Sequence, residues 1–154
     1  MNTTKGRTMS ASASAHNERG PAGTLVMRLY DEALNGSDYA TVVDEVVGSD
    51  VIVHELDGDR HGRDAVASTM RTLHSAFTQM HFDVHDLIEA DDKVVVRWRM
   101  VGTHTGEFAR FAATGKEIEQ RAIVIYAVRD GVVVAVWPMI DRLGMARQLQ
   151  AAGR

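Results

Sequence analysis

The sequence predicts an α+β domain in which a curved antiparallel sheet wraps around N-terminal helices. Two observations support this prediction. Apolar residues recur at helical spacings of three and four in the first half of the chain, whereas the second half consists of strand-like runs without another long helix. Helices followed by a strand meander are typical of an α+β fold, in which one face of the sheet packs on the helices.

The first half contains three predicted helices and one strand. Pro21 suits the first turn of a helix, Asn35-Gly36 ends that helix, and Asp38 can cap the next one. Glycines at 58 and 62 indicate a loop before the third helix. The predicted helices cover residues 21–34, 38–47 and 63–77, and the strand covers residues 51–54.

Four strands follow in the second half. Asp91-Asp92 and Arg129-Asp130-Gly131 supply tight turns between them, which indicates a meander of neighbouring antiparallel strands. A short amphipathic segment ends the chain. The predicted strands cover residues 79–88, 93–104, 116–128 and 132–140.

Length and composition restrict the class of protein. At 154 residues the chain accommodates one domain, which we place at 21–154, after a tail at 1–20 whose polar composition predicts disorder. A net charge of −4 and a pI near 5.9 argue against nucleic-acid or anionic-membrane partners. Cysteine is absent, which excludes disulfides and thiolate chemistry and is compatible with the cytoplasmic location that we expect. No apolar run approaches the ~20 residues that span a bilayer.

One long stretch carries a family resemblance. In order, it contains Arg97-Trp98-Arg99, Gly102-Thr103-His104-Thr105-Gly106-Glu107, Asp130-Gly131 and Gly144-Met145-Ala146-Arg147-Gln148-Leu149. This order resembles the SnoaL-like polyketide cyclases, within the nuclear-transport-factor-2-like superfamily. The resemblance is strong over residues 94–149 and looser over residues 25–77. It implies that the α+β domain is a cone-shaped α+β barrel.

The resemblance also implies that the usual catalytic residue is missing. In these cyclases the ring-closing base is an aspartate in the last strand, and the alignment places Pro138 at that position. Proline cannot accept a proton. Side chains alternate between the two faces of a strand, so the neighbours of Pro138 at two-residue spacing share its inward face. The residues predicted to face inward on the last two strands, and so to bind substrate, are Ala122, Val124, Tyr126, Val136 and Pro138.

Arg97 and Arg99 are candidates for the catalytic chemistry. They lie two apart on one strand and therefore on one face, where guanidinium groups could hold an enolate, phenolate or carboxylate. The alternative is that they face solvent or pair with Asp83 or Glu119 across the sheet, which leaves Trp98 to pack in the core.

Three residues have polar side chains whose role in the predicted site has two interpretations each. His54 ends the first strand and is either a base that titrates near neutral pH or a hydrogen-bonded histidine at the mouth. Tyr126 either donates to a ligand carbonyl or fills the pocket. The resemblance implies that Asp141 matches an acidic residue common in the SnoaL-like family just before the last helix. Asp141 either contacts substrate or caps that helix.

We expect no metal site and no bound cofactor. His81, Asp83 and His85 share one face of a strand and have side chains that can bind metals. The alternate residues Phe82 and Val84 are apolar and should face the core, which turns the other three toward water. The sequence also lacks a dinucleotide or phosphate-binding fingerprint.

The resemblance implies a tailoring enzyme of aromatic polyketide biosynthesis that acts on an anthracycline-type polycyclic substrate. Loss of the base fits a branch of the family that hydroxylates such rings without bound metal or flavin. A deprotonated hydroquinone can pass an electron to dioxygen, so we expect dioxygen as the co-substrate and a separate reductase as a partner. Two alternatives stay open, namely an aldol cyclase with a different base and a non-catalytic binding protein for a polycyclic ligand.

We also expect a homodimer that forms through the convex face of the sheet. If Trp98 and Met100 face outward, they extend an apolar row on the two following strands, with no helix left to cover it. A shift of one residue in the strand phase would reverse the two faces. The expected row contains Trp98, Met100, Ile123, Ile125, Trp137 and Met139.

Overall fold

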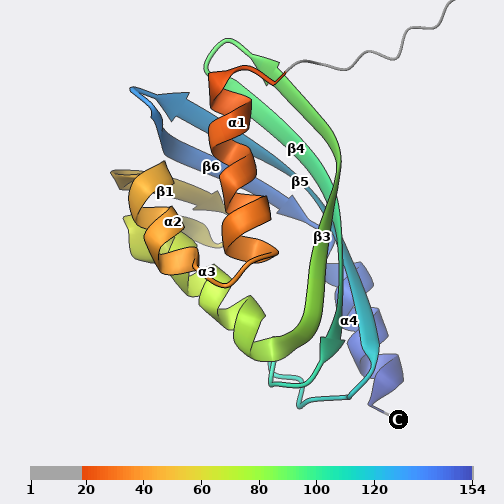
Figure 1. Cartoon of the computed structure of the whole chain (residues 1–154). Coiled ribbons are helices and arrows are strands. Elements are labelled where there is room, and N and C mark those ends of the chain that lie inside the picture. The colour runs from red at the N-terminus through yellow and green to blue at the C-terminus, as the bar shows by residue number, and fades with distance from the viewer. Residues whose placement is uncertain (1–18, 154) are drawn as a thin grey trace, which may run out of the picture.

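The computed structural model describes residues 19–153, so nearly all of the tail predicted at 1–20 lies outside the described residues. The chain forms one six-stranded sheet with helices around it (Figure 1). The elements are α1 (Pro21–Arg28), the π-helical segment η1 (Leu29–Leu34), α2 (Tyr39–Val46), β1 (Val47–Glu55), β2 (Gly58–His61), α3 (Arg63–Ala76), β3 (Phe77–Ala90), β4 (Lys93–His104), β5 (Glu117–Arg129), β6 (Val132–Ile140) and α4 (Arg142–Ala152).

The predicted α+β class is confirmed, with two corrections to the sheet. The strand order is β2-β1-β6-β5-β4-β3, and β1 runs parallel to β6, so the sheet is mixed and not wholly antiparallel. The segment Gly58–His61 was predicted as a loop but forms β2, paired antiparallel with β1. This short strand reads Gly-Asp-Arg-His and is mostly exposed, so no apolar alternation in the sequence marks it as a strand. The sheet edges are β2 and β3, so the barrel stays open.

Helices α1, α2 and α3 lie against the concave side of the bent sheet, whereas α4 packs on β5 (Figure 1). Register shifts in β3, where Gln79 has a φ of 51°, bend that strand around the helices. Asn35 fixes the end of the first helical segment to β3, because its side chain bonds both the N–H and the carbonyl of Phe82, at 2.7 and 3.0 Å. No helix within residues 19–153 is long and apolar enough to cross a membrane.

Strand β4 buries its even-numbered residues, which corrects the predicted strand phase. Trp98 and Met100 are 6% and 0% exposed, and the register pairs Trp98 with Ala122 on the inner face of β5. Arg97 pairs in register with Ile123, so it lies on the outer face. The prediction that Trp98 and Met100 belong to an outward row is therefore wrong by one residue in β4.

The predicted phases of β5 and β6 are confirmed. Val124 pairs with Pro138 on the inner face, and Ile125 pairs with Trp137 on the outer face. Val124 is buried, whereas Ile125 and Trp137 are each 37% exposed. The concave side of these two strands therefore presents the apolar wall that the sequence predicts.

Candidate active site

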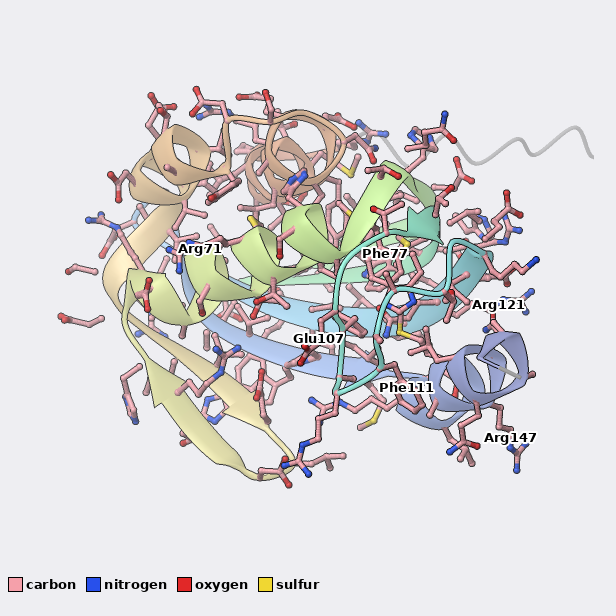
Figure 2. All side chains as sticks on the ribbon, turned by 90° about the horizontal axis from the view of Figure 1, so that it is seen from below. Arg71, Phe77, Glu107, Phe111, Arg121 and Arg147 are labelled. Carbon is pink, nitrogen blue, oxygen red and sulfur yellow. The ribbon has the colours of Figure 1, made fainter. Side chains whose placement is uncertain are left out.

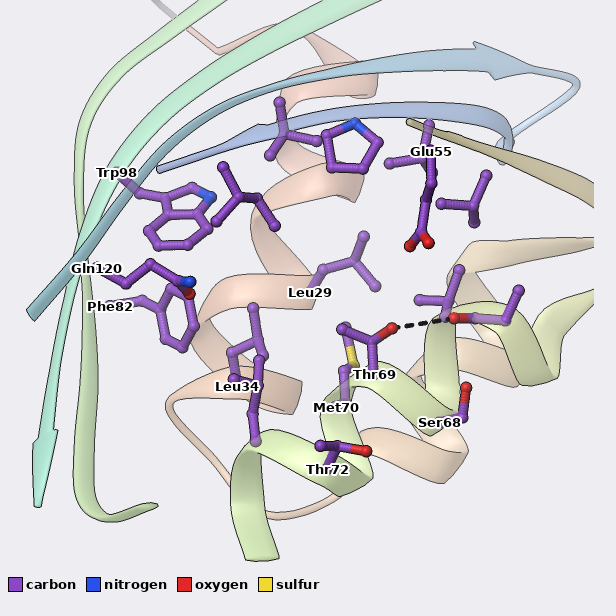
Figure 3. Close-up of a pocket in the computed structure, with 18 of the residues that line it drawn as sticks. Leu29, Leu34, Glu55, Ser68, Thr69, Met70, Thr72, Phe82, Trp98 and Gln120 are labelled. Atoms are coloured by element: carbon purple, nitrogen blue, oxygen red, sulfur yellow. Dashed lines mark hydrogen bonds between the residues drawn. The ribbon is translucent and has the colours of Figure 1, made fainter. Parts of the chain in front are cut away.

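A cavity of about 470 Å³ lies between the concave face of the sheet and α3 (Figure 3). Its walls come from η1, α3, α4 and all six strands, together with the loop between β4 and β5, and most of the lining residues are apolar. A volume of this order suits a drug-sized ligand, for which pockets of roughly 300–1,000 Å³ are usual. The cavity can therefore accommodate a polycyclic aromatic molecule.

One end of the cavity is aromatic. The rings of Phe82 and Trp98 meet edge to face with centroids 4.8 Å apart, and both side chains lie together in the close-up (Figure 3). Tyr30 packs edge to face on Phe82 at 6.2 Å and on Tyr126 at 6.4 Å. All four side chains line the cavity. Edge-to-face arrangements of this kind present ring surfaces on which a flat aromatic ligand can pack.

The tyrosine pair gives this aromatic end its polar groups. The hydroxyl oxygens of Tyr30 and Tyr126 are 2.7 Å apart. Burial raises the pKa of Tyr126 to about 12, and burial together with the neighbouring Tyr126 raises the pKa of Tyr30 well above its ordinary value, against a smaller opposing effect of a hydrogen bond from Trp98. Both phenols are therefore neutral near pH 7 and serve as hydrogen-bonding groups, not as bases.

The loop between β4 and β5 closes another side of the cavity. Phe108, Ala109 and Phe111 line it, and the backbones of Phe108 and Phe111 bond to each other at 2.8 and 3.0 Å. Figure 2 shows this loop between α3 and α4, with Phe111 on the α4 side. Ala109 has a φ of 49°, which an L-residue adopts only at a cost.

Charged groups lie at the partly exposed rim. Glu55 at the end of β1 forms an ion pair with Arg60 of β2, with 2.8 Å between Oε1 and Nη2. Arg60 also donates to Thr69 and Ser68 of α3, at 2.9 and 3.3 Å. Arg142 at the start of α4 contributes a second cation to the lining. These residues were not predicted from the sequence.

His54 does not line the cavity, so the predicted placement of this candidate base is wrong. Its ring stacks on Trp137 on the outer face, with centroids 5.0 Å apart, and its Nδ1 lies 2.9 Å from Asp59. The preceding residues Val51–Val53 are all apolar, so the sequence carries no alternation from which to assign the strand face.

Arg97 and Arg99 also lie on the outer face, which corrects their predicted position in the cavity. Arg97 pairs with Asp86 of β3, with 2.5 Å between Nε and Oδ2. Arg99 pairs with Glu119 at 2.7 Å, and the bonds from Arg99 and Arg121 lower the pKa of the Glu119 carboxyl. Arg121 itself points away from the molecule (Figure 2). The alternative interpretation, pairing across the sheet, is therefore correct for Arg99.

The inward-facing residues of β5 and β6 lie where the sequence places them. Val124, Tyr126, Val136 and Pro138 line the cavity, and Ala122 is buried on the same face without contributing to the lining. Their role in binding substrate stays a prediction.

Asp141 is the N-cap of α4 in the structure, and its Oδ1 accepts a bond from Gly144 N at 2.8 Å. His81 and Asp83 pair with each other on the exposed surface at 3.1 Å. Within residues 19–153, no three His, Asp or Glu side chains are grouped so that they could hold a metal ion.

Comparisons with known proteins agree with this architecture. The sequence matches the family described as SnoaL-like polyketide cyclase over residues 24–149. No curated protein sequence matches the chain.

Solved structures of the same fold include a SnoaL-like candidate polyketide cyclase from Jannaschia sp. CCS1, with a TM-score of 0.79, 20% identity, and coverage of 85% of this chain and 92% of that one. AclR, a candidate hydroxylase from Streptomyces galilaeus, has a TM-score of 0.75, 21% identity and coverage of 84% and 81%. IdmH, a candidate polyketide cyclase from Streptomyces antibioticus, has a TM-score of 0.71, 24% identity and coverage of 86% and 99%. At these identities the likeness establishes the shared fold.

Proposed function

The chain belongs to the SnoaL-like polyketide cyclase family, and from this premise we propose that it hydroxylates an anthracycline-type polycyclic aromatic polyketide. The substrate binds in the cavity of about 470 Å³. Dioxygen is the co-substrate, and the protein holds no cofactor of its own.

The wall formed by β5 and β6 is the observation that supports this proposal. Val124 and Pro138 lie opposite each other in register and line the cavity with Val136. None of these side chains can accept a proton, although the family resemblance places the ring-closing base at Pro138. The wall therefore favours binding of a flat apolar ring system over the usual base-catalysed ring closure at that position.

The proposed chemistry balances when the substrate arrives as a hydroquinone. A hydroquinone and one dioxygen give a hydroxyquinone and one water, so the substrate supplies the two electrons that reduce the second oxygen atom. A separate reductase must therefore reduce the quinone first. The protein excludes bulk water from the reduced ring and orients it. Tyr126 donates a hydrogen bond to a quinone or phenol oxygen of the substrate.

Oxygen incorporation tests this proposal directly. The dithionite-reduced form of 1,4-dihydroxyanthraquinone is freed of excess reductant, mixed with the protein and exposed to ¹⁸O₂. We expect oxygen uptake faster than spontaneous oxidation and a product that carries one ¹⁸O atom per added hydroxyl. Heat-denatured protein is the control for spontaneous oxidation. If the hydroquinone is only oxidised back to the starting quinone, with no ¹⁸O atom incorporated, the proposal is contradicted.

Aldol ring closure is the second candidate function, because Glu55 places one carboxylate on the cavity lining. A cyclase that uses this carboxylate would not need a base at position 138. Ring closure consumes no dioxygen, so turnover of an anthracycline-type methyl ester under argon would support the cyclase instead. A ligand that binds tightly without turnover in either assay would indicate a binding protein.

A further inference from the structure

We propose that Glu55 is the catalytic base that removes a proton from the substrate, and that Arg60 positions the Glu55 carboxylate. This inference rests on the proposed function for its class of substrate, which is a polycyclic aromatic molecule with a weakly acidic O–H or C–H group. The proton transfer itself is common to hydroxylation and ring closure.

The fold directs Glu55 into the cavity. Glu55 shares a strand face with Val51 and Val53, which are both buried, whereas His54 lies on the opposite face. Its carboxylate extends into the space between β1 and α3, at the end of the cavity away from Trp98 (Figure 3). Among the described residues that line the cavity, Glu55 is the one carboxylate, and none is a histidine.

Arg60 restricts the orientation of that carboxylate. Its Nη2 donates to Glu55 Oε1 at 2.8 Å and to Thr69 Oγ1 at 2.9 Å, and its Nη1 donates to Ser68 Oγ at 3.3 Å. The guanidinium is therefore fixed between the β1–β2 hairpin and α3. No bond joins Glu55 Oε2 to any of residues 19–153, so this oxygen is free to accept the substrate proton.

One N–H group of Arg60 makes no hydrogen bond to residues 19–153. This group is Nε–H, which is buried. A buried N–H without a partner is costly, and an anionic oxygen is the strongest partner that such a group can take. Because this N–H is buried, a substrate oxyanion would reach it only after the Arg60 side chain moves toward the cavity.

The proton transfer conserves the charge of the site. The substrate O–H or C–H bond breaks, the proton moves to Glu55 Oε2, and the electron pair stays on the substrate as a phenolate or enolate. The negative charge thus passes from the carboxylate to the substrate while the Arg60 guanidinium remains beside it. A charge that moves next to a fixed cation is stabilised without reorganisation of water.

Hydrogen exchange of anthrone under argon tests the base. Anthrone is a three-ring aryl ketone whose methylene hydrogens are weakly acidic, and mass spectrometry follows their replacement by deuterium from D₂O. Quenching of tryptophan fluorescence measures binding. We expect the wild-type protein to bind anthrone and accelerate the exchange, and Glu55→Gln to bind similarly but lose at least about 100-fold of the acceleration, the usual contribution of a general base. Asp59→Asn is the matched control, because Asp59 lies on the same hairpin but bonds His54 on the outer face.

Arg60→Met and Arg60→Lys test the positioning role. Arg60→Met should lower the exchange rate of bound anthrone while the binding constant changes little, and Arg60→Lys should restore part of the rate. If Arg60 had a purely structural role, its substitution would change the unfolding midpoint but would not lower the exchange rate while leaving the binding constant unchanged.

Equal exchange by Glu55→Gln and wild type would overturn the assignment of the base. Failure of the wild type to bind anthrone, or to accelerate its exchange, would overturn it as well. Glu55-dependent exchange without any ¹⁸O incorporation in the hydroquinone assay would leave Glu55 as the base and reject hydroxylation, so the two proposals fail separately.

Discussion

The phenol oxygens of Tyr30 and Tyr126 lie 2.7 Å apart inside the molecule, although 96 positions separate the two residues in the chain. Tyr30 belongs to the π-helical segment η1, and Tyr126 lies on the inner face of β5. Either hydroxyl can donate to the other, and the hydroxyl that accepts keeps its own proton for a ligand. The pair thus links helix–sheet packing to ligand binding.

Removal of one hydroxyl should leave the other one buried without its partner. We expect Tyr126→Phe to lower the free energy of unfolding by about 1–3 kcal/mol. The double variant Tyr30→Phe/Tyr126→Phe should cost less than the sum of the two single variants, because it leaves no unpaired phenol. Urea denaturation measures all three, with Tyr39→Phe on α2 as the control. Strictly additive costs would show that the two hydroxyls are not coupled.

The raised tyrosine pKa values predict a loss of stability at alkaline pH. The pKa of Tyr126 is about 12 in the folded protein, against about 10 in the unfolded chain. The folded state holds the Tyr126 proton more tightly than the unfolded chain does. The stability that this proton contributes is therefore fully present below pH 10 and is lost as the pH rises toward 12. The loss from Tyr126 is on the order of 2–3 kcal/mol, at about 1.4 kcal/mol for each difference of one in pKa. Urea unfolding between pH 8 and pH 11.5 should show it, with a shallower decline in Tyr126→Phe.

The two tryptophans should respond to substitution in opposite ways. Trp98 is 6% exposed and lines the cavity, so Trp98→Ala should cost about 3–5 kcal/mol and weaken ligand binding. Trp137 lies on the outer face, 37% exposed, with His54 stacked on it. We expect this face to form a homodimer, so Trp137→Lys should give a folded monomer by light scattering. The corrected outer row contains Ile123, Ile125, Trp137 and Met139.

Thr78→Lys on β3 is a control for the dimer, because it adds a charge at an exposed position away from the row. A wild-type protein that is monomeric at assay concentrations would rule out the dimer. A dimer that persists in Trp137→Lys would place the interface elsewhere.

The sequence could have revealed the phase of β4. Trp98 and Met100 alternate with Arg97 and Arg99, which by itself places Trp98 inside, as the structure confirms. The expectation that Arg97 and Arg99 hold a substrate anion in the cavity favoured the opposite face. The alternation of arginine and apolar residues predicted the faces of β4 correctly, because burial of an unpaired guanidinium costs a large free energy.

The first strand offered no such guide. Residues 51–53 are uniformly apolar, so alternation does not distinguish His54 from Glu55 as the residue that faces inward. The β1–β2 hairpin settles this question in the structure, because Glu55 pairs with Arg60 and Arg60 bonds to α3. These contacts join three elements and cannot be derived from spacing along the chain. By contrast, the bounds of β4 and β6 match the prediction at both ends.

Substitution of the outer arginines should leave ligand binding unchanged. Arg97 forms an exposed ion pair with Asp86, and Arg99 forms a partly exposed pair with Glu119, both outside the cavity. Exposed pairs contribute roughly 0–1 kcal/mol, so Arg97→Met and Arg99→Met should each change the free energy of unfolding by no more than that. Anthrone binding and exchange should equal those of the wild type. A loss of exchange in either variant, with the fold retained, would return these residues to the candidate site.

Pro138→Asp introduces a carboxylate where the resemblance to the SnoaL-like cyclases implies their ring-closing base. The side chain at 138 lines the cavity opposite Val124. We expect the variant to fold, with a loss of about 1–3 kcal/mol for the partly buried polar group. It should acquire weak ring closure of an anthracycline-type methyl ester, followed by chromatography under argon. Pro138→Asn is the matched control, because its amide has nearly the same shape but does not act as a base. Closure by the aspartate variant alone would show that the missing carboxylate at position 138 accounts for the lack of cyclase activity. Rapid closure by the wild type would show that the protein is itself a cyclase.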